Sequence, residues 1–249
     1  MVATKFLKRR AKVFTISPVS ADGAERADSI ADLRTENLDL AVTMGGDGTT
    51  LRTFRGLDDV TPLLTINVGG NRGILAEITM DELDSAIRQI ASDRIILERR
   101  TRVVASIGGE EFAPALNEIL IQRKNLTKTA EIEIKFQNDY VKQKMDGVII
   151  ATPSGSTGHS FSLGGPILHE SLDVLIITPV APVYRLESIV VPDEKIEIVC
   201  SHDCSVVMDA QVIKSAGFGE TITIKKYNTP ATFVRLKKRG LRQMSKLGF

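Results

Sequence analysis

Leu38-Asp39-Leu40-Ala41-Val42-Thr43-Met44 runs directly into Gly45-Gly46-Asp47-Gly48-Thr49, and Thr50-Leu51-Arg52-Thr53-Phe54 follows. The first part is an apolar run of strand length, the second is a glycine-rich turn, and the third can open a helix. In a parallel α/β sheet, glycines at the carboxyl end of a strand let the backbone approach a phosphate. The N–H groups and the positive dipole end of the next helix add to that attraction. The stretch therefore predicts a phosphate site at the start of a helix.

The chain on either side of this stretch continues the same pattern. Short apolar runs at Val13–Ile16 and Leu63–Val68 are further strands, and a helix begins at Thr79, where Glu82 completes a capping box. Strands that alternate with helices indicate a parallel sheet. We expect an α/β domain over residues 1–97.

The hydrophobic period changes to two after about residue 95. Ile132, Ile134 and Phe136 alternate with charged residues, and later segments repeat the pattern. Such alternation is typical of half-buried strands. We therefore expect a β-rich domain over residues 98–236, followed by a helix within residues 237–249 that packs back on the first domain.

Composition limits the partners. Lys and Arg number 32 against 31 Asp and Glu, so the net charge of +1 provides no general attraction for nucleic acid or an anionic membrane. No apolar stretch approaches the length of a membrane span. The only cysteines, Cys200 and Cys204, are too few for a disulfide framework, which favours a cytoplasmic protein. A zinc site with His202 lacks a fourth ligand, so no metal ligands are predicted.

Asp47 is the candidate catalytic residue of the glycine-rich turn. A carboxylate there can orient a hydroxyl group and accept its proton during phosphoryl transfer. Two structural alternatives remain: Asp47 caps the helix, or the Asp-Gly pair only makes a tight turn. The turn matches neither the phosphate loop that ends in Gly-Lys-Ser/Thr nor the spaced glycines of a dinucleotide fingerprint.

A second polar segment extends from Thr152 to Ile167 and is rich in Ser, Thr and Gly. Its hydroxyl groups suit a ribose and an amide-bearing base, and the alternative is a flexible linker. It lacks the spacing of a nucleophile elbow, so a serine nucleophile is not supported. Upstream lie Asn117-Glu118 and Asp146, which is preceded two residues earlier by Lys144. Taken separately, Asn117-Glu118 can simply begin a strand, and the Asp-Gly pair at Asp146 can simply make a hairpin turn.

Together these motifs resemble the NAD kinase family of archaeal and bacterial type over most of the chain. The matching segments, in order, are Gly45–Thr49, Asn67–Leu75, Asn117-Glu118, Asp146-Gly147 and Thr152–Ile167. The first is shared with diacylglycerol and sphingosine kinases, so it indicates a superfamily. The last selects NAD kinases among them.

The resemblance implies a Rossmann-like first domain and a β-rich, sandwich-like second domain, with NAD in the crevice between them. It implies phosphorylation of the 2′-hydroxyl of the adenosine ribose of NAD, with ATP or polyphosphate as donor. A divalent cation, Mg²⁺, would arrive with the donor. A neighbouring subunit would complete the pocket, so a homodimer or homotetramer is expected. A lipid kinase of the diacylglycerol or sphingosine type and a non-catalytic NAD-binding sensor remain alternatives.

The resemblance also implies residue roles, with Asp47 as the catalytic base. Fifteen residues would bind NAD: Asp47, Gly48, Arg52, Asn117, Glu118, Lys144, Asp146, Thr157, Gly158, His159, Ser160, Phe161, Ser162, Ala181 and Gln211. The phosphate-donor loop would comprise Gly45, Gly46, Gly48, Thr49 and Arg72. Arg52 and Arg72 are assigned from their chemistry, because guanidinium groups can contact phosphate oxygens in bidentate geometry, and the alternative is that both are surface arginines. His159 stands where the family commonly has Tyr, and the segment around Ala181 departs from the usual Cys-Pro-His, which puts contacts at both positions in question.

Overall fold

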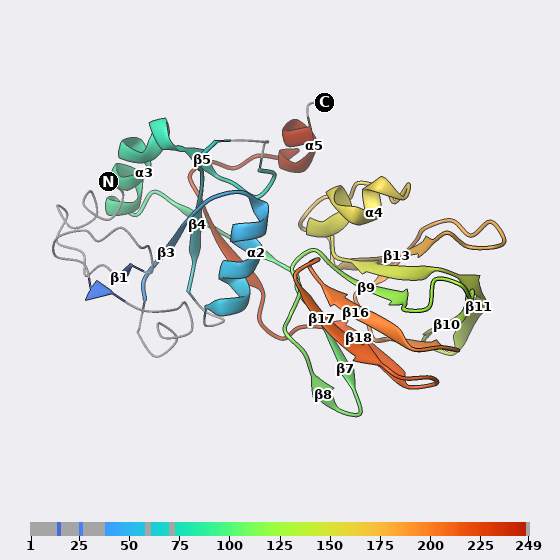
Figure 1. Ribbon diagram of the computed structural model, residues 1–249. Helices are drawn as coiled ribbons and strands as arrows, with labels where there is room; N and C mark the ends of the chain where they lie inside the picture. Colours follow the sequence, from blue (N-terminus) through green and yellow to red (C-terminus); the bar gives the residue numbers. More distant parts are fainter. Residues whose placement is uncertain (1–13, 16–24, 27–37, 58–60, 70–72, 248–249) are drawn as a thin grey trace. The chain divides into compact units, whose positions relative to one another are not determined.

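The structure, a computed structural model, divides into two compact units (Figure 1). The described residues are 14–15, 25–26, 38–57, 61–69 and 73–247. Unit 1 comprises Met1–Glu98 with Thr232–Arg242, and unit 2 comprises Arg99–Ala231 with Gln243–Phe249. None of the helices in these described segments has the length and hydropathy of a membrane span.

Unit 1 is built on a sheet in the order β3-β4-β19-β6, with β5 beside β4. The strands are β3 (Ala41–Met44), β4 (Leu63–Asn67), β5 (Ile78–Thr79), β6 (Ile96–Arg100) and β19 (Ala231–Arg235). β4 pairs in parallel with β3, β5 and β19. A separate parallel pair joins β1 (Phe14–Thr15) to β2 (Glu25–Arg26). The predicted parallel α/β architecture is confirmed.

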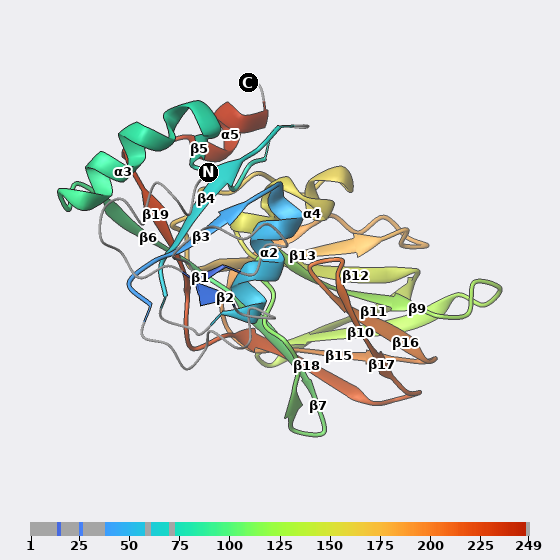
Figure 2. The same ribbon diagram turned by 60° about the vertical axis from the view of Figure 1, so that its left-hand side comes forward.

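Successive residues of a strand point to opposite sides of the sheet, so the apolar strands of unit 1 have two faces to bury. Helices cover both of these faces. Leu64 and Ile66 of β4 share a core with helix α3 (Leu83–Ala91). On the other face, Phe54 of helix α2 (Asp47–Gly56) meets Phe233 edge to face, with ring centroids 4.7 Å apart. Figure 2 shows α2 and α3 on either side of β3 and β4.

The predicted capping box lies at the start of the short 3-10 helix η2 (Met80–Glu82), which leads into α3. The Thr79 N–H donates to a carboxylate oxygen of Glu82 at 3.0 Å. The pairing satisfies a donor that the helix itself leaves open, so the predicted helix start is confirmed.

The chain returns to unit 1 near its end. The sequence pattern predicts residues 98–236 as the second domain, but β19 pairs with β4, and residues 232–242 belong to unit 1. β19 is a short apolar strand like those of unit 2, so its composition gives no sign of its partner. The division then falls within helix α5 (Arg242–Leu247), since Arg242 ion-pairs with Glu77 of unit 1 and residues from 243 onward belong to unit 2.

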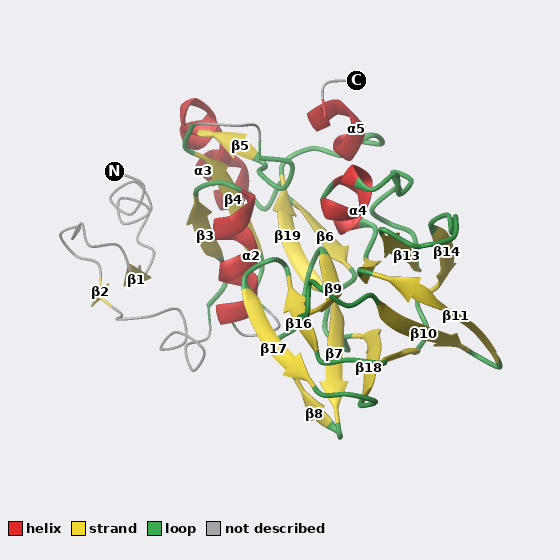
Figure 3. Ribbon diagram, turned by 45° about the vertical axis from the view of Figure 1, so that its right-hand side comes forward, coloured by secondary structure: helices red, strands yellow, loops and turns green. Residues whose placement is uncertain are grey.

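Unit 2 is a sandwich of two six-stranded antiparallel sheets (Figure 3). The first sheet runs β11 (Asp139–Met145), β10 (Ala130–Phe136), β15 (Ile196–Cys200), β18 (Thr221–Lys226), β7 (Val103–Ile107) and β8 (Glu110–Glu111). The second runs β14 (Ile189–Pro192), β13 (Val174–Val180), β12 (Gly147–Ala151), β9 (Glu118–Arg123), β16 (Cys204–Met208) and β17 (Val212–Ala216). One core holds residues of both sheets, which confirms the sandwich-like prediction.

The period-two pattern places that core. In β10, Ile132 and Ile134 are buried between the sheets, whereas Glu131 and Glu133 on the other face remain partly exposed. Because the side-chain period of a strand is two, each apolar position of the pattern reaches the core only in this register.

Candidate functional site

The predicted turn lies between β3 and α2. Gly45 has φ +154°, and a Cβ atom there would lie 2.5 Å from Oγ1 of Thr49, so only glycine fits. Gly46 is the N-cap, and its carbonyl accepts the N–H groups of Thr49 and Thr50 at 3.1 and 3.2 Å. The strand therefore passes into the helix without a side chain over the helix start.

Asp47, the first residue of α2, is held by backbone amides from another segment. The Ile74 N–H donates to Oδ2 at 2.9 Å and the Leu75 N–H donates to Oδ1 at 3.0 Å. Two amides fix the plane of the carboxylate, and each oxygen keeps a further lone pair for a hydroxyl group. The capping alternative is wrong, because Gly46 is the cap and no side chain caps this helix.

We name Gly73, Ile74 and Leu75 the amide clamp. A Cβ atom on Gly73 would lie 3.0 Å from Oδ1 of Asp47, so a larger residue would press on the carboxylate. The family resemblance included this segment but assigned it no role. Main-chain donors carry no side-chain signal, so only their position in the fold reveals them.

The other predicted residues of unit 1 lie around the helix start. Gly48, Thr49 and Arg52 are exposed on α2. Arg72 lies outside the described residues.

In unit 2, Asn117 and Glu118 are anchored at the start of β9 by a residue that the prediction left out. The carboxylate of Asp209, only 3% exposed, accepts the N–H groups of Leu116, Asn117 and Glu118 at 3.0, 2.8 and 3.3 Å. Asp209 has φ +49°, a left-handed conformation that Asp tolerates better than most residues. The resemblance implied a role for Gln211, two residues further along the chain, but none for Asp209.

Two acceptors of this pair face no donor. Among the described residues, Oδ1 of Asn117 and Oε2 of Glu118 are buried without a hydrogen-bond partner. A Cβ atom on Gly158 would lie 3.4 Å from Oε2 of Glu118, so glycine leaves that oxygen uncovered. Unsatisfied buried acceptors are costly, which indicates that a ligand with hydroxyl or amine donors completes them.

Burial raises the pKa of Glu118 to about 7, and the negative charge of Asp209 adds to the rise. The folded protein therefore keeps the proton at a pH where the unfolded chain, in which a glutamate has its ordinary pKa of 4.5, has lost it. The stability that this protonation contributes is complete below pH 4.5 and is lost as the pH rises to about 7.

A Glu118→Gln variant tests this assignment. We expect wild-type stability to decline by on the order of 3 kcal/mol more than that of the variant between pH 5 and pH 8. Urea unfolding at several pH values, without nucleotide, measures the difference. Glu110→Gln, at an exposed position of β8, serves as control and should retain the wild-type decline. Equal declines for Glu118→Gln and the wild type would show that Glu118 is ionised in the fold at pH 5.

The Thr152–Ile167 segment is anchored, so the linker alternative is wrong. It forms a 3-10 turn, η3 (Ser154–Thr157), and helix α4 (His159–Ser162). Oγ1 of Thr152 donates to the Leu116 carbonyl at 2.5 Å, and the Thr152 N–H donates to the Asn117 carbonyl at 2.8 Å. All four residues of η3 are buried. The hydrogen bonds tie this segment directly to the Asn117-Glu118 pair.

Some hydroxyl groups of this segment form hydrogen bonds within unit 2, and others are exposed. Oγ of Ser160 lies 2.8 Å from Oγ1 of Thr178, and Oγ1 of Thr157 donates to the Ser154 carbonyl at 3.4 Å. These two hydroxyls support the fold, which the sequence did not distinguish from ligand contacts. His159, Phe161 and Ser162 are exposed and stay available to a ligand.

Of the remaining predicted residues of unit 2, Lys144, Asp146 and Ala181 lie near the junction of β11 and β12, whereas Gln211 lies at the opposite end of β9, beside Glu118. Asp146 ion-pairs with Nε of Arg123 at 2.7 Å, and its N–H donates to the Val180 carbonyl at 2.9 Å. Ala181 follows in a left-handed conformation with φ +47°, which is strained for a residue with a Cβ. Lys144 is exposed on β11. Gln211 lies in the β16–β17 turn, its N–H bonded to the Met208 carbonyl at 3.0 Å.

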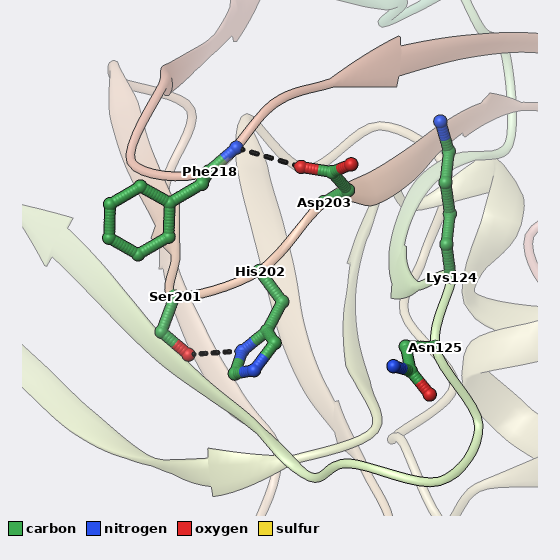
Figure 4. A pocket seen from close by; sticks show the side chains of 6 residues that line it. All are labelled: Lys124, Asn125, Ser201, His202, Asp203 and Phe218. Carbon is green, nitrogen blue, oxygen red and sulfur yellow. Dashed lines mark hydrogen bonds between the residues drawn. The ribbon is translucent and has the colours of Figure 1, made fainter.

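A separate surface pocket lies beside the β15–β16 connection and contains none of the predicted residues. Figure 4 shows its lining: Lys124, Asn125, Ser201, His202, Asp203 and Phe218. His202 bonds to Ser201 there, whereas Cys200 and Cys204 are free thiols buried in the sandwich core. In the described part of the chain no three His, Cys, Asp or Glu side chains are grouped to hold a metal ion.

The family is decided by comparison with known proteins. Residues 4–95 match the ATP-NAD kinase N-terminal domain, and residues 116–236 match the ATP-NAD kinase C-terminal domain. The chain belongs to the NAD kinase family. An NAD kinase of Thermoanaerobacter sp. is 34% identical over 210 residues, which cover 80% of this chain and 74% of the relative. An NAD kinase of Methanothermobacter thermautotrophicus is 33% identical over 83% of this chain and 75% of its own length.

Solved structures agree with this membership. A crystal structure of an NAD kinase from Archaeoglobus fulgidus in complex with ATP is 32% identical, with a TM-score of 0.79 over 90% of this chain and 88% of that one. Yeast NADH kinase in complex with NADH has a TM-score of 0.87 over the whole of this chain and 82% of its own, but only 21% identity, so it bears on the fold alone. The predicted family and fold class of the NAD kinases are confirmed.

Proposed function

We propose that this chain transfers the terminal phosphoryl group of ATP to the 2′-hydroxyl of the adenosine ribose of NAD, giving NADP and ADP. A bond forms between the 2′-oxygen and the γ-phosphorus, the bond from that phosphorus to the bridging β–γ oxygen breaks, and the hydroxyl proton passes to Asp47. The observation that carries the proposal is the Asp47 carboxylate, fixed at the start of α2 by two amides. The family membership supports the acceptor, since the relatives are NAD kinases.

Unit 1 would supply the phosphoryl-transfer groups. The start of α2 offers backbone N–H groups and a positive dipole end to phosphate oxygens. The exposed Gly48, Thr49 and Arg52 lie on this helix. Phosphoryl transfer depends mainly on positioning and charge stabilisation, and a rigidly held carboxylate serves the first of these.

Unit 2 would bind the nucleoside groups of NAD. The unpaired oxygens of Asn117 and Glu118 accept hydrogen bonds from hydroxyl or amine donors, both of which NAD carries. The exposed side chains of α4 add contacts, with His159 in place of the usual aromatic stacking residue. A lipid acceptor offers few donors for these buried oxygens, which argues against the lipid kinase alternative.

Mg²⁺ would accompany ATP as part of the donor complex, bound mainly by phosphate oxygens and water. Inorganic polyphosphate is the second candidate donor. We also propose that the protein is cytoplasmic, because its two cysteines are free thiols. We further propose that it forms a homo-oligomer, and light scattering would give the number of subunits.

The assay for this proposal follows NADP formation with a dehydrogenase specific for NADP. We expect NAD, ATP and Mg²⁺ together to yield NADP, and we expect chelation of the metal to stop the reaction. Polyphosphate replaces ATP in a parallel reaction, and diacylglycerol or sphingosine replaces NAD in another. Phosphorylated lipid without NADP would establish the lipid kinase, and tight NAD binding without any turnover would establish a non-catalytic sensor.

A further inference from the structure

The carbonyl of Leu75, at the end of the amide clamp, is itself held by two donors. Oγ1 of Thr65 donates to it at 2.9 Å, and Nη1 of Arg235 donates to it at 3.2 Å. The N–H of the same residue donates to Asp47. The position of Leu75 thus connects the strands of unit 1 with the carboxylate proposed to take the proton.

Thr65 holds this segment at two points. Its Oγ1 also accepts the N–H of Glu77 at 3.0 Å, so one hydroxyl group joins residues on both sides of Ala76. Thr65 lies in β4, is 1% exposed and cannot change its position without moving the strand. The hydroxyl therefore fixes where the clamp lies on the sheet.

Arg235 supports the same carbonyl from β19. It is 1% exposed and ion-paired with Glu77 at 3.3 Å and Glu98 at 2.9 Å. Removing this arginine would take one of two cationic partners from each of Glu77 and Glu98 inside unit 1, where Arg242 is the other, so it is a poor choice for mutation. Its presence means that the Leu75 carbonyl keeps one donor when Thr65 is changed.

We propose that Thr65 is a positioning residue for the catalytic carboxylate, acting through the Leu75 carbonyl and the amide clamp on the orientation of Asp47. The proposal rests on the proposed function, in which Asp47 accepts the proton of the acceptor hydroxyl. A small displacement of the clamp would rotate the carboxylate away from that hydroxyl, and phosphoryl transfer is sensitive to such displacement.

A Thr65→Val variant isolates this tether. Valine matches threonine in shape, the Glu77 N–H also donates to the Thr65 carbonyl at 2.9 Å, and the Leu75 carbonyl keeps Arg235. No buried group at this point loses its last partner, so the variant should fold. We expect kcat for NADP formation to fall about 10-fold with KM for NAD changed by less than about 2-fold, and Thr65→Ser to restore kcat.

Thr43→Val is the matched control. Thr43 lies opposite Thr65 in the β3–β4 register, and its hydroxyl is also buried, 3.1 Å from Oγ1 of Thr53. Thr53 keeps its bond to the Thr49 carbonyl at 2.9 Å. This variant loses a comparable hydroxyl without touching the clamp, so we expect kcat within about 2-fold of the wild type.

Amide hydrogen exchange provides a second readout. In Thr65→Val we expect faster exchange at Ile74 and Leu75, and wild-type protection there in Thr65→Ser and Thr43→Val. Wild-type kcat in Thr65→Val, an equal fall in Thr43→Val, or a fall without faster exchange at the clamp would each overturn the inference. Turnover near the wild-type rate in Asp47→Asn would instead overturn the proposed role of Asp47, so the two failures are distinguishable.

Discussion

An Asp47→Asn variant should lose about 10³-fold in kcat for NADP formation while its KM for NAD changes little, because general-base catalysis contributes roughly 10²- to 10⁴-fold. Asparagine cannot accept the hydroxyl proton. It also brings an NH₂ group against one of the two clamp amides, which donate to both carboxylate oxygens in the wild type. The variant thus loses both the proton acceptor and part of its orientation.

Steady-state kinetics and calorimetric titration with NAD separate these losses. Asp39→Asn, an exposed aspartate just before β3, removes the same charge from the same unit and should keep wild-type kcat. Thermal unfolding of both variants checks that unit 1 is intact. Turnover near the wild-type rate in Asp47→Asn would falsify the assignment of Asp47 as the proton acceptor.

Gly155→Ala should cause the largest structural loss in unit 2. A Cβ atom at this position would lie 2.1 Å from the Asn117 carbonyl oxygen and 2.5 Å from its carbon. Asn117 cannot yield, because its carbonyl accepts the Thr152 N–H and its own N–H donates to Asp209. We expect the free energy of unfolding to fall by about 3 kcal/mol or more and NAD binding to weaken at least about 10-fold.

The control for this variant is Gly240→Ala. A Cβ atom at Gly240 meets no atom within 4 Å, so its stability should change by less than about 0.5 kcal/mol. Urea unfolding and NAD titration of the two variants decide the outcome. Wild-type stability and wild-type affinity in Gly155→Ala would mean that η3 can move away from Asn117 at no cost, and that this contact does not shape the NAD site.

The sequence predicted those elements that depend on interactions between residues close together in the chain. The double glycine before Asp47 indicated the strand-to-helix turn, because only glycine adopts the conformation of residue 45 beside Thr49. The Thr79 and Glu82 pair indicated a helix start, since its hydrogen bond spans three residues. The period-two pattern of β10 predicted the buried face of a sandwich strand.

The family motifs identified candidate residues but did not distinguish those that face a ligand from those that support the fold. Asn117 and Glu118 do carry unpaired buried oxygens among the described residues, as ligand-binding side chains would. Ser160 carried the same prediction, but its hydroxyl bonds to Thr178 inside unit 2. A hydroxyl group that binds a ligand and one that supports a loop look alike in a sequence, because only the neighbours in space differ.

The sequence by itself determined the turn before α2, the two kinds of unit and the identity of the carboxylate at the helix start. Only the tertiary structure decided that β19 joins unit 1, that Asp209 holds the backbone of Asn117 and Glu118, and that the amides of Ile74 and Leu75 hold Asp47. The physical reason is the same in each case. These contacts join residues far apart in the chain through backbone N–H and C=O groups, which every residue except proline carries alike.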